Sequence, residues 1–134
     1  MSFKNSVFSF VGVLALAGCA APESENVTQL TVDFSWQNVS RCTTSPPAFQ
    51  IEGIPSTTKT LTFSMMDLNV PTFQHGGGRI TYSGSSSVPA GAFSYRGPCP
   101  PAGSTHRYEF TVNALDADGR VVARGKAMRQ FPAQ

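Results

Sequence analysis

The chain has 134 residues, which is enough for one small domain with a single core. Ten lysines and arginines stand against eight acidic residues, and no basic stripe with interleaved aromatic residues is present. This near balance of charge argues against nucleic acid and other polyanions as partners.

The first 18 residues have the pattern of an export signal. Lys4 precedes an apolar run over 7–17, which is shorter than the roughly 20 residues that a permanent membrane-spanning helix needs. The motif Leu-Ala-Gly-Cys at 16–19 resembles the lipobox of bacterial lipoproteins. The resemblance implies cleavage before Cys19 and acylation of its thiol, whereas the alternative is an ordinary secretory signal with a cysteine nearby by chance.

The segment that follows the lipobox is polar and has no hydrophobic period. We therefore expect a signal peptide over 1–18, a lipidated tether over 19–29 and one folded domain over 30–134. Ala20 after the cysteine fits the sorting pattern of lipoproteins of the outer membrane. The predicted location is the bacterial cell envelope, on the periplasmic face of the outer membrane.

Assigning Cys19 to lipid leaves two cysteines, Cys42 and Cys99, in an oxidising compartment. A disulfide between them is one expectation. Two free buried thiols are the other, because cysteine packs well as a small apolar residue.

The rest of the chain alternates apolar and polar residues with a period of two. LTVDFSW at 30–36, LTFSM at 61–65 and YEFTVNA at 108–114 each place their apolar side chains on one face, as strands over a core do. We expect a further strand over 121–124 and a surface loop over 83–91. The predicted fold is all-β, an antiparallel β-sandwich.

His-Gly-Gly-Gly at 75–78 has the form of the oxyanion-hole loop of lipases and esterases. Those enzymes also need a G-x-S-x-G elbow on a parallel sheet, but the GSSS at 84–87 is followed by Val88. We therefore reject the esterase interpretation. The glycines instead allow the chain to pass close to a ligand or a neighbouring strand.

A longer motif, near the C-terminal end of the chain, indicates a binding protein instead of an esterase. Residues 95–116, YRGPCPPAGSTHRYEFTVNALD, resemble the signature of the phosphatidylethanolamine-binding protein family, and in particular its bacterial Raf kinase inhibitor-like branch. SPPAF at 45–49 and TKTL at 58–61 fit the same pattern, so that the resemblance covers roughly residues 28–131. It implies a β-sandwich with a small cleft for an anionic group such as phosphate or a phospholipid headgroup.

The family's ligand-binding positions carry over residue by residue. Asp67 matches the first acid of the family's D-P-D-A-P loop, Pro71 matches its last proline, and His75 matches the histidine that follows. The resemblance implies a ligand-binding set of Asp67, Pro71, His75, Gly97, Pro98, Cys99, Pro100, His106 and Tyr108.

These residue types suit an anion. Two imidazoles and a phenol supply N–H and O–H donors, and prolines at the wall make a preformed rim. Asp67 would repel an anion, so we expect it to accept a hydrogen bond from a histidine and fix its tautomer, or to bind an amine headgroup. It could also simply begin a turn.

The sequence departs from the family pattern at three points: DLNVP at 67–71 replaces D-P-D-A-P, Gly76 follows the histidine, and the chain ends at Gln134, where many relatives continue. We therefore expect a more open, shallower and less acidic cleft. The predicted function is a membrane-anchored binding module with no catalytic role, no metal and no cofactor. The alternatives are a small acid–base or metal-dependent enzyme using His75, His106 and Asp67, and a structural envelope lipoprotein with a vestigial cleft.

Overall fold

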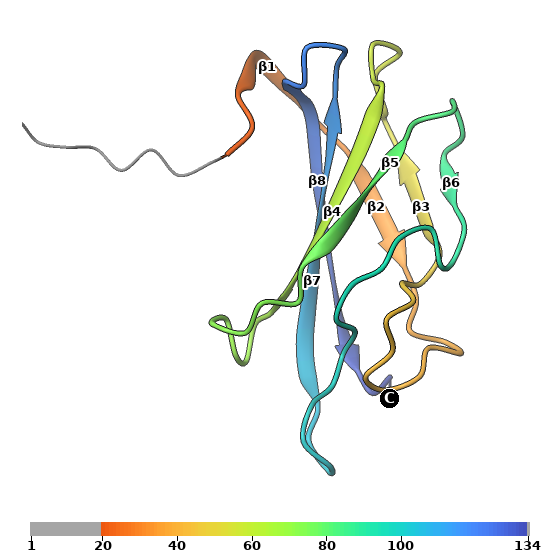
Figure 1. The fold of residues 1–134 in the computed structure, drawn as a ribbon, viewed down its shortest axis with the longest axis vertical. Coiled ribbons are helices and arrows are strands. Elements are labelled where there is room, and N and C mark those ends of the chain that lie inside the picture. The colour runs from red at the N-terminus through yellow and green to blue at the C-terminus, as the bar shows by residue number, and fades with distance from the viewer. Residues whose placement is uncertain (1–19, 134) are drawn as a thin grey trace, which may run out of the picture.

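The computed structural model describes residues 20–133, and within them it contains eight strands and no helix. No helix in this part of the chain could cross a membrane. One sheet has five strands and the other has three, and the two sheets face each other (Figure 1). In sheet order, the larger consists of β1 (Glu23–Gln29), β8 (Val121–Phe131), β7 (His106–Leu115), β4 (Thr60–Asp67) and β5 (Gly77–Thr81), and the smaller of β2 (Thr31–Phe34), β3 (Phe49–Glu52) and β6 (Ser87–Val88).

Strand β7 lies at the centre of the larger sheet. It pairs antiparallel with β4, from Leu115 opposite Thr60 to Tyr108 opposite Asp67, and antiparallel with β8 on its other side. All pairs in both sheets are antiparallel except that of β1 with β8. The antiparallel sandwich predicted from the period of two is confirmed.

An aromatic cluster fills the space between the sheets. The ring of Phe110 on β7 is fully buried and meets Phe34 of β2 and Phe49 of β3 edge to face, at centroid distances of 5.1 and 4.9 Å. Burying each such ring contributes about 2 kcal/mol of hydrophobic free energy, and the edge-to-face geometry adds to it. The cluster therefore packs β7 of the larger sheet against β2 and β3 of the smaller sheet.

The tether expected over 19–29 is wrong from residue 23 onward. Residues Glu23–Gln29 form β1, which pairs parallel with β8 from Glu23 opposite Val121 to Gln29 opposite Arg124. The guanidinium of Arg124 also contacts the carboxylate of Glu23 at 2.7 Å. A polar edge strand needs backbone partners but no buried face, and so it carries no hydrophobic period. The signal over 1–18 and the lipidation site at Cys19 lie outside the described residues.

The loop expected over 83–91 contains the short strand β6. Ser87 and Val88 pair with Gln50 and Phe49 of β3, and the Val88 side chain is buried. One buried valine among serines and glycines is too short a pattern to show a period, and so this strand could not be predicted from its residues.

Two of the three glycines at 76–78 allow close packing of β5. A Cβ atom on Gly77 would lie 1.8 Å from the carbonyl oxygen of Phe63, and one on Gly78 would lie 2.3 Å from Cβ of Phe93. The glycines therefore admit a neighbouring strand and an aromatic ring.

Candidate functional site

The site forms where β4 ends and β7 begins. Asp67, the last residue of β4, lies opposite Tyr108 of β7, and its buried carboxylate binds in two directions. Its Oδ1 accepts from the backbone N–H groups of Asn69 at 2.8 Å and Val70 at 3.2 Å, while its Oδ2 accepts from His106 Nδ1 at 2.7 Å. Asp67 thus starts a turn and orients a histidine at the same time, two roles that were separate expectations.

The surroundings of Asp67 keep it ionised. Burial favours its neutral form, but the hydrogen bonds from His106 and from the backbone of Asn69 and Val70 outweigh burial and hold the pKa of the carboxyl below its usual value. His106 therefore donates from Nδ1 to a carboxylate, and its Nε2 remains for another partner.

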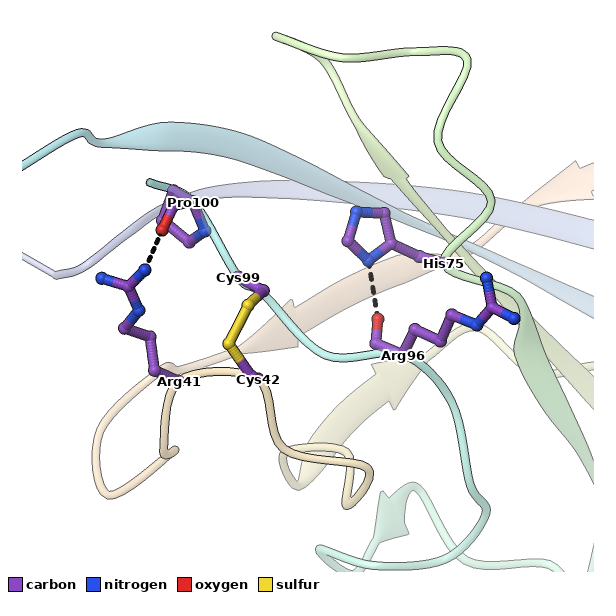
Figure 2. The surroundings of a disulfide bond; sticks show 6 residues. All are labelled: Arg41, Cys42, His75, Arg96, Cys99 and Pro100. Carbon is purple, nitrogen blue, oxygen red and sulfur yellow. Dashed lines mark hydrogen bonds between the residues drawn. A yellow bond between two sulfur atoms is a disulfide. The ribbon is translucent and has the colours of Figure 1, made fainter. Parts of the chain in front are cut away.

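His75 is held in the same way by a different acceptor. It is buried between the β4–β5 loop and β5, and its Nδ1 donates to the carbonyl oxygen of Arg96 at 2.6 Å (Figure 2). The backbone N–H of Arg96 donates in return to the carbonyl oxygen of His75 at 2.8 Å. The Nδ1 atoms of His75 and His106 thus both make hydrogen bonds within the protein, and their Nε2 atoms are left to bind a ligand.

Tyr108 lies between the two imidazoles. Its ring centroid is 5.5 Å from that of His75 and 6.2 Å from that of His106, and its side chain is fully buried. Burial, with the nearby charge of Asp67, raises the pKa of the phenol to about 12. Its Oη lies near the carboxylate of Asp67 and the backbone of Cys99, but within residues 20–133 it makes no hydrogen bond of full geometry with either. A buried hydroxyl without a well-formed hydrogen bond is uncommon.

Two more buried donors lie near Tyr108, and sequence reasoning missed both. Tyr95 Oη and Trp36 Nε1 have no partner within the described residues, and the Trp36 ring lies 6.1 Å from that of Tyr108. Burial raises the pKa of Tyr95 well above its usual value, and Tyr108 adds to the effect. Tyr95 opens the motif over 95–116, which was the signal that could have identified it, whereas Trp36 reads only as core.

One wall of the site is fastened by a disulfide. Cys42 and Cys99 are bonded, with their Cα atoms 4.6 Å apart, so the disulfide is confirmed and the alternative of two free thiols is wrong. The backbone N–H of Cys42 also donates to the carbonyl oxygen of Pro98 at 2.8 Å, and the guanidinium of Arg41 donates to that of Pro100 (Figure 2).

The residues of this wall face inward. Gly97, Pro98 and Pro100 are all buried, and Gly97 donates its N–H to the carbonyl oxygen of Thr43 at 2.8 Å. The prolines therefore pack inside the protein, and the solvent-facing rim expected for them is not present. Pro71, by contrast, is exposed on the β4–β5 loop.

The open, shallow cleft expected from the sequence is also not observed around these residues. Asp67, His75 and Tyr108 are buried, and His106 reaches the surface with 14% of its side chain exposed. The prominent hollows of residues 20–133 lie elsewhere, with volumes of about 420 Å³ beside the stretch 35–48 and about 620 Å³ beside Trp36 and Arg129.

The candidate metal ligands of the site do not converge on one point in the described part of the chain. Within residues 20–133, no cluster of three His, Cys, Asp or Glu side chains is placed to hold a metal ion, and so Asp67, His75 and His106 do not form such a triad. What remains for a ligand is the Nε2 atom of each imidazole and the hydroxyl of Tyr108.

Comparison with known proteins agrees with the fold. The phosphatidylethanolamine-binding protein family matches residues 74–132, a range that includes His75, His106 and Tyr108 but not Asp67 or Pro71. No curated protein matches the chain in sequence.

Two solved structures are similar. A phosphatidylethanolamine-binding protein homologue from Chlamydia trachomatis is 19% identical, with a TM-score of 0.57 over 82% of this chain and 100% of its own. YbcL from Escherichia coli, described as a member of the mammalian phosphatidylethanolamine-binding protein family, is 17% identical, with a TM-score of 0.53 over 68% of this chain and 82% of its own. Residues 74–132 therefore match a phosphatidylethanolamine-binding protein domain, within a fold that the chain shares with bacterial homologues of that family.

Proposed function

We propose that this domain is a binding module for a small anionic group, such as phosphate or a phospholipid headgroup, and that it has no catalytic role. One observation carries the proposal. Within the described residues, the hydroxyl of Tyr108 is buried without a well-formed hydrogen bond, between two imidazoles whose Nδ1 atoms are both already bonded. An anion placed there would accept from all three side chains.

Anion binding at this site requires protons. Because Nδ1 of each ring donates to an oxygen, a neutral ring presents the lone pair of Nε2, which repels an anion. An imidazolium presents an N–H instead. Anion binding should therefore be coupled to the uptake of protons by the imidazoles. The carboxylate of Asp67 offsets one of the two imidazolium charges, which leaves a net positive site.

The absence of catalysis is proposed from the state of Asp67. This carboxylate would be the natural general base, but three hydrogen bonds hold it and lower its pKa, which makes it a weak base. The two imidazoles have acceptors on one nitrogen each and no hydroxyl or thiol nucleophile bonded to the other.

We also propose that Cys19 carries lipid and places the domain on the periplasmic face of the outer membrane. The motif at 16–19 supports this, and so does the disulfide between Cys42 and Cys99, since such bonds persist in oxidising compartments. Metabolic labelling with a radioactive fatty acid should mark the wild-type chain and not Cys19→Ser. Labelling of both would contradict the anchor.

Thermal unfolding with inorganic phosphate tests the binding site. A protein that begins at Ala20 suits this test because it keeps both sheets and every core contact described. Phosphate should raise the melting temperature of the wild type and of Arg79→Gln, an exposed control on β5, but not that of His75→Gln or His106→Ala. Urea unfolding without phosphate verifies that each variant is folded.

Other results would favour other functions. If neither phosphate nor any other anion stabilises the wild type, the structural interpretation replaces binding. If the purified wild type carries a metal ion that the His75→Gln variant lacks, a metal-dependent activity becomes the favoured function in place of anion binding.

A further inference from the structure

The loop that joins β4 to β5 exposes two apolar side chains at its tip. Val70 is 41% exposed and Phe73 is 46% exposed, and the hydrogen bond from Phe73 N to Val70 O, at 3.0 Å, closes a turn between them. The loop projects away from the two sheets, at the lower left of Figure 1. Single exposed apolar residues are ordinary, but two in one projecting turn indicate a contact surface.

Two arginines flank this tip. The guanidinium of Arg96 lies 6.0 Å from the centre of the Phe73 ring, and the backbone N–H of Arg107 donates to Asn69 Oδ1 at 2.9 Å. Both arginines are exposed, and neither makes an ion pair within residues 20–133. The acid of this loop, Asp67, is buried beneath it and engaged with His106. The surface is therefore apolar at its centre and positive at its edges.

The same loop is a wall of the anion site. It begins after Asp67 and ends at His75, and the Phe73 ring packs on the His75 ring at a centroid distance of 4.6 Å. A partner that contacts the Phe73 ring is therefore separated from the His75 imidazole only by that ring.

We infer that residues 68–74, with Arg96 and Arg107, form a contact for the surface of an anionic phospholipid bilayer. Val70 and Phe73 would enter the boundary between headgroups and acyl chains, and the arginines would meet lipid phosphates. Charge complementarity favours this occupant. A protein partner would need about 800 Å² on this side, far more than two side chains supply, whereas a small apolar tip adds usefully to electrostatic attraction by a membrane.

The inference deepens the proposed function and rests on it for the identity of the ligand. A domain that docks through this loop holds its anion site against the bilayer, so the anion it receives is a lipid headgroup. Free phosphate would fill the same donors but would make no use of Val70 and Phe73.

Co-sedimentation with vesicles tests the docking surface, using the protein that begins at Ala20 so that no anchor contributes. It should bind vesicles of phosphatidylglycerol and phosphatidylethanolamine, and much less those of phosphatidylcholine. Val70→Gln and Phe73→Gln should weaken binding about fivefold to tenfold each. Arg96→Gln and Arg107→Gln should weaken it about fivefold each, and salt should weaken it further.

Met128→Gln is the matched control, because Met128 is 41% exposed, as Val70 is, but lies on β8. It should leave vesicle binding unchanged. An equal loss of vesicle binding in Met128→Gln and Val70→Gln would overturn the inference. A wild type that does not bind anionic vesicles would also overturn it, even if a soluble protein were then found to bind the loop.

Phosphate-dependent thermal stabilisation separates this inference from the proposed function. Arg107→Gln, at an exposed position with no assigned role in the anion site, should keep the phosphate response while its vesicle binding weakens. A wild type that responds to phosphate but ignores vesicles refutes the docking surface alone. A wild type that shows the predicted vesicle pattern without any phosphate response supports the docking surface and refutes the anion site.

Discussion

The two walls of the candidate site are built in opposite ways. The segment 96–100 is tied by a disulfide between Cys42 and Cys99, and its prolines, Pro98 and Pro100, are buried. The segment 68–74 has no cross-link and is exposed along most of its length, and its first turn is held by Oδ1 of Asp67.

The two walls therefore have different tasks: one positions the hydrogen-bond donors of the site, and the other contacts a partner. The fastened wall fixes the position of His75 through the carbonyl oxygen of Arg96, and so it sets the geometry of the donors. The exposed wall has few buried side chains and is accessible to a partner. If this division is correct, changes in the fastened wall affect stability, and changes in the exposed wall affect binding at surfaces.

Removal of the disulfide should have the largest effect. Closing a loop over a sequence separation of 57 residues stabilises the fold by about 4 kcal/mol on the loop-entropy account. Urea unfolding of Cys42→Ala/Cys99→Ala, and of the wild type with reductant, should show a loss of that order together with weaker phosphate binding. Unchanged stability would mean that the wall is held by packing alone.

Asp67→Asn should come next. The substitution keeps an oxygen for the turn but removes the charged partner of His106, at a cost of about 2 kcal/mol. The folded pKa of Asp67 is lowered, so its contribution is present above the unfolded pKa of about 4 and is lost as the pH falls through the lower folded value. Urea unfolding across acidic pH should therefore show a shallower loss in Asp67→Asn.

Asp33→Asn is the control for that series, since Asp33 is exposed and its pair with Arg129 lies at the surface. Its stability should change by no more than about 0.5 kcal/mol. An equal effect of the two substitutions would show that the turn and the histidine contact are not the source of the loss.

Tyr108→Phe should separate stability from binding. Removing a buried hydroxyl that has no partner should stabilise the protein by about 1 kcal/mol at neutral pH while it weakens phosphate binding. Because burial raises the folded pKa to about 12, ionisation of this phenol leaves wild-type stability unchanged below about pH 10 and lowers it as the pH rises toward 12. Tyr108→Phe should unfold less readily in alkali, as urea titrations can measure. A less stable Tyr108→Phe would indicate that the hydroxyl has an acceptor.

The central strands were predictable because burial imposes a period on the sequence. Leu61, Phe63 and Met65 alternate with polar residues since one face of β4 packs on the core. Strand β1 escaped prediction because β8 supplies its hydrogen bonds and no face of it is buried. The pairing of Cys42 and Cys99 was predictable only as one of two alternatives.

The site was predictable by resemblance and not by spacing. Asp67 and His106 are 39 residues apart, and only the register of β4 against β7 brings them together. The partner of His75 is the carbonyl oxygen of Arg96, which every residue possesses, so no side-chain pattern could reveal it. The closed state of the site depends on packing around Tyr108, which a motif does not encode.

The smallest expected effect comes from one proline in the exposed wall, compared with one in the fastened wall. Pro71→Ala should change stability by only about 0.5 kcal/mol, because Pro71 is exposed and acts mainly by restricting the unfolded chain. Pro98→Ala makes the same chemical change at a buried position and should cost about 1 to 2 kcal/mol. Urea unfolding and the phosphate response of the two variants provide the comparison. Equal losses would mean that the two walls are equally rigid, and the exposed loop would then lose its role as the part of the site that is free to meet a membrane.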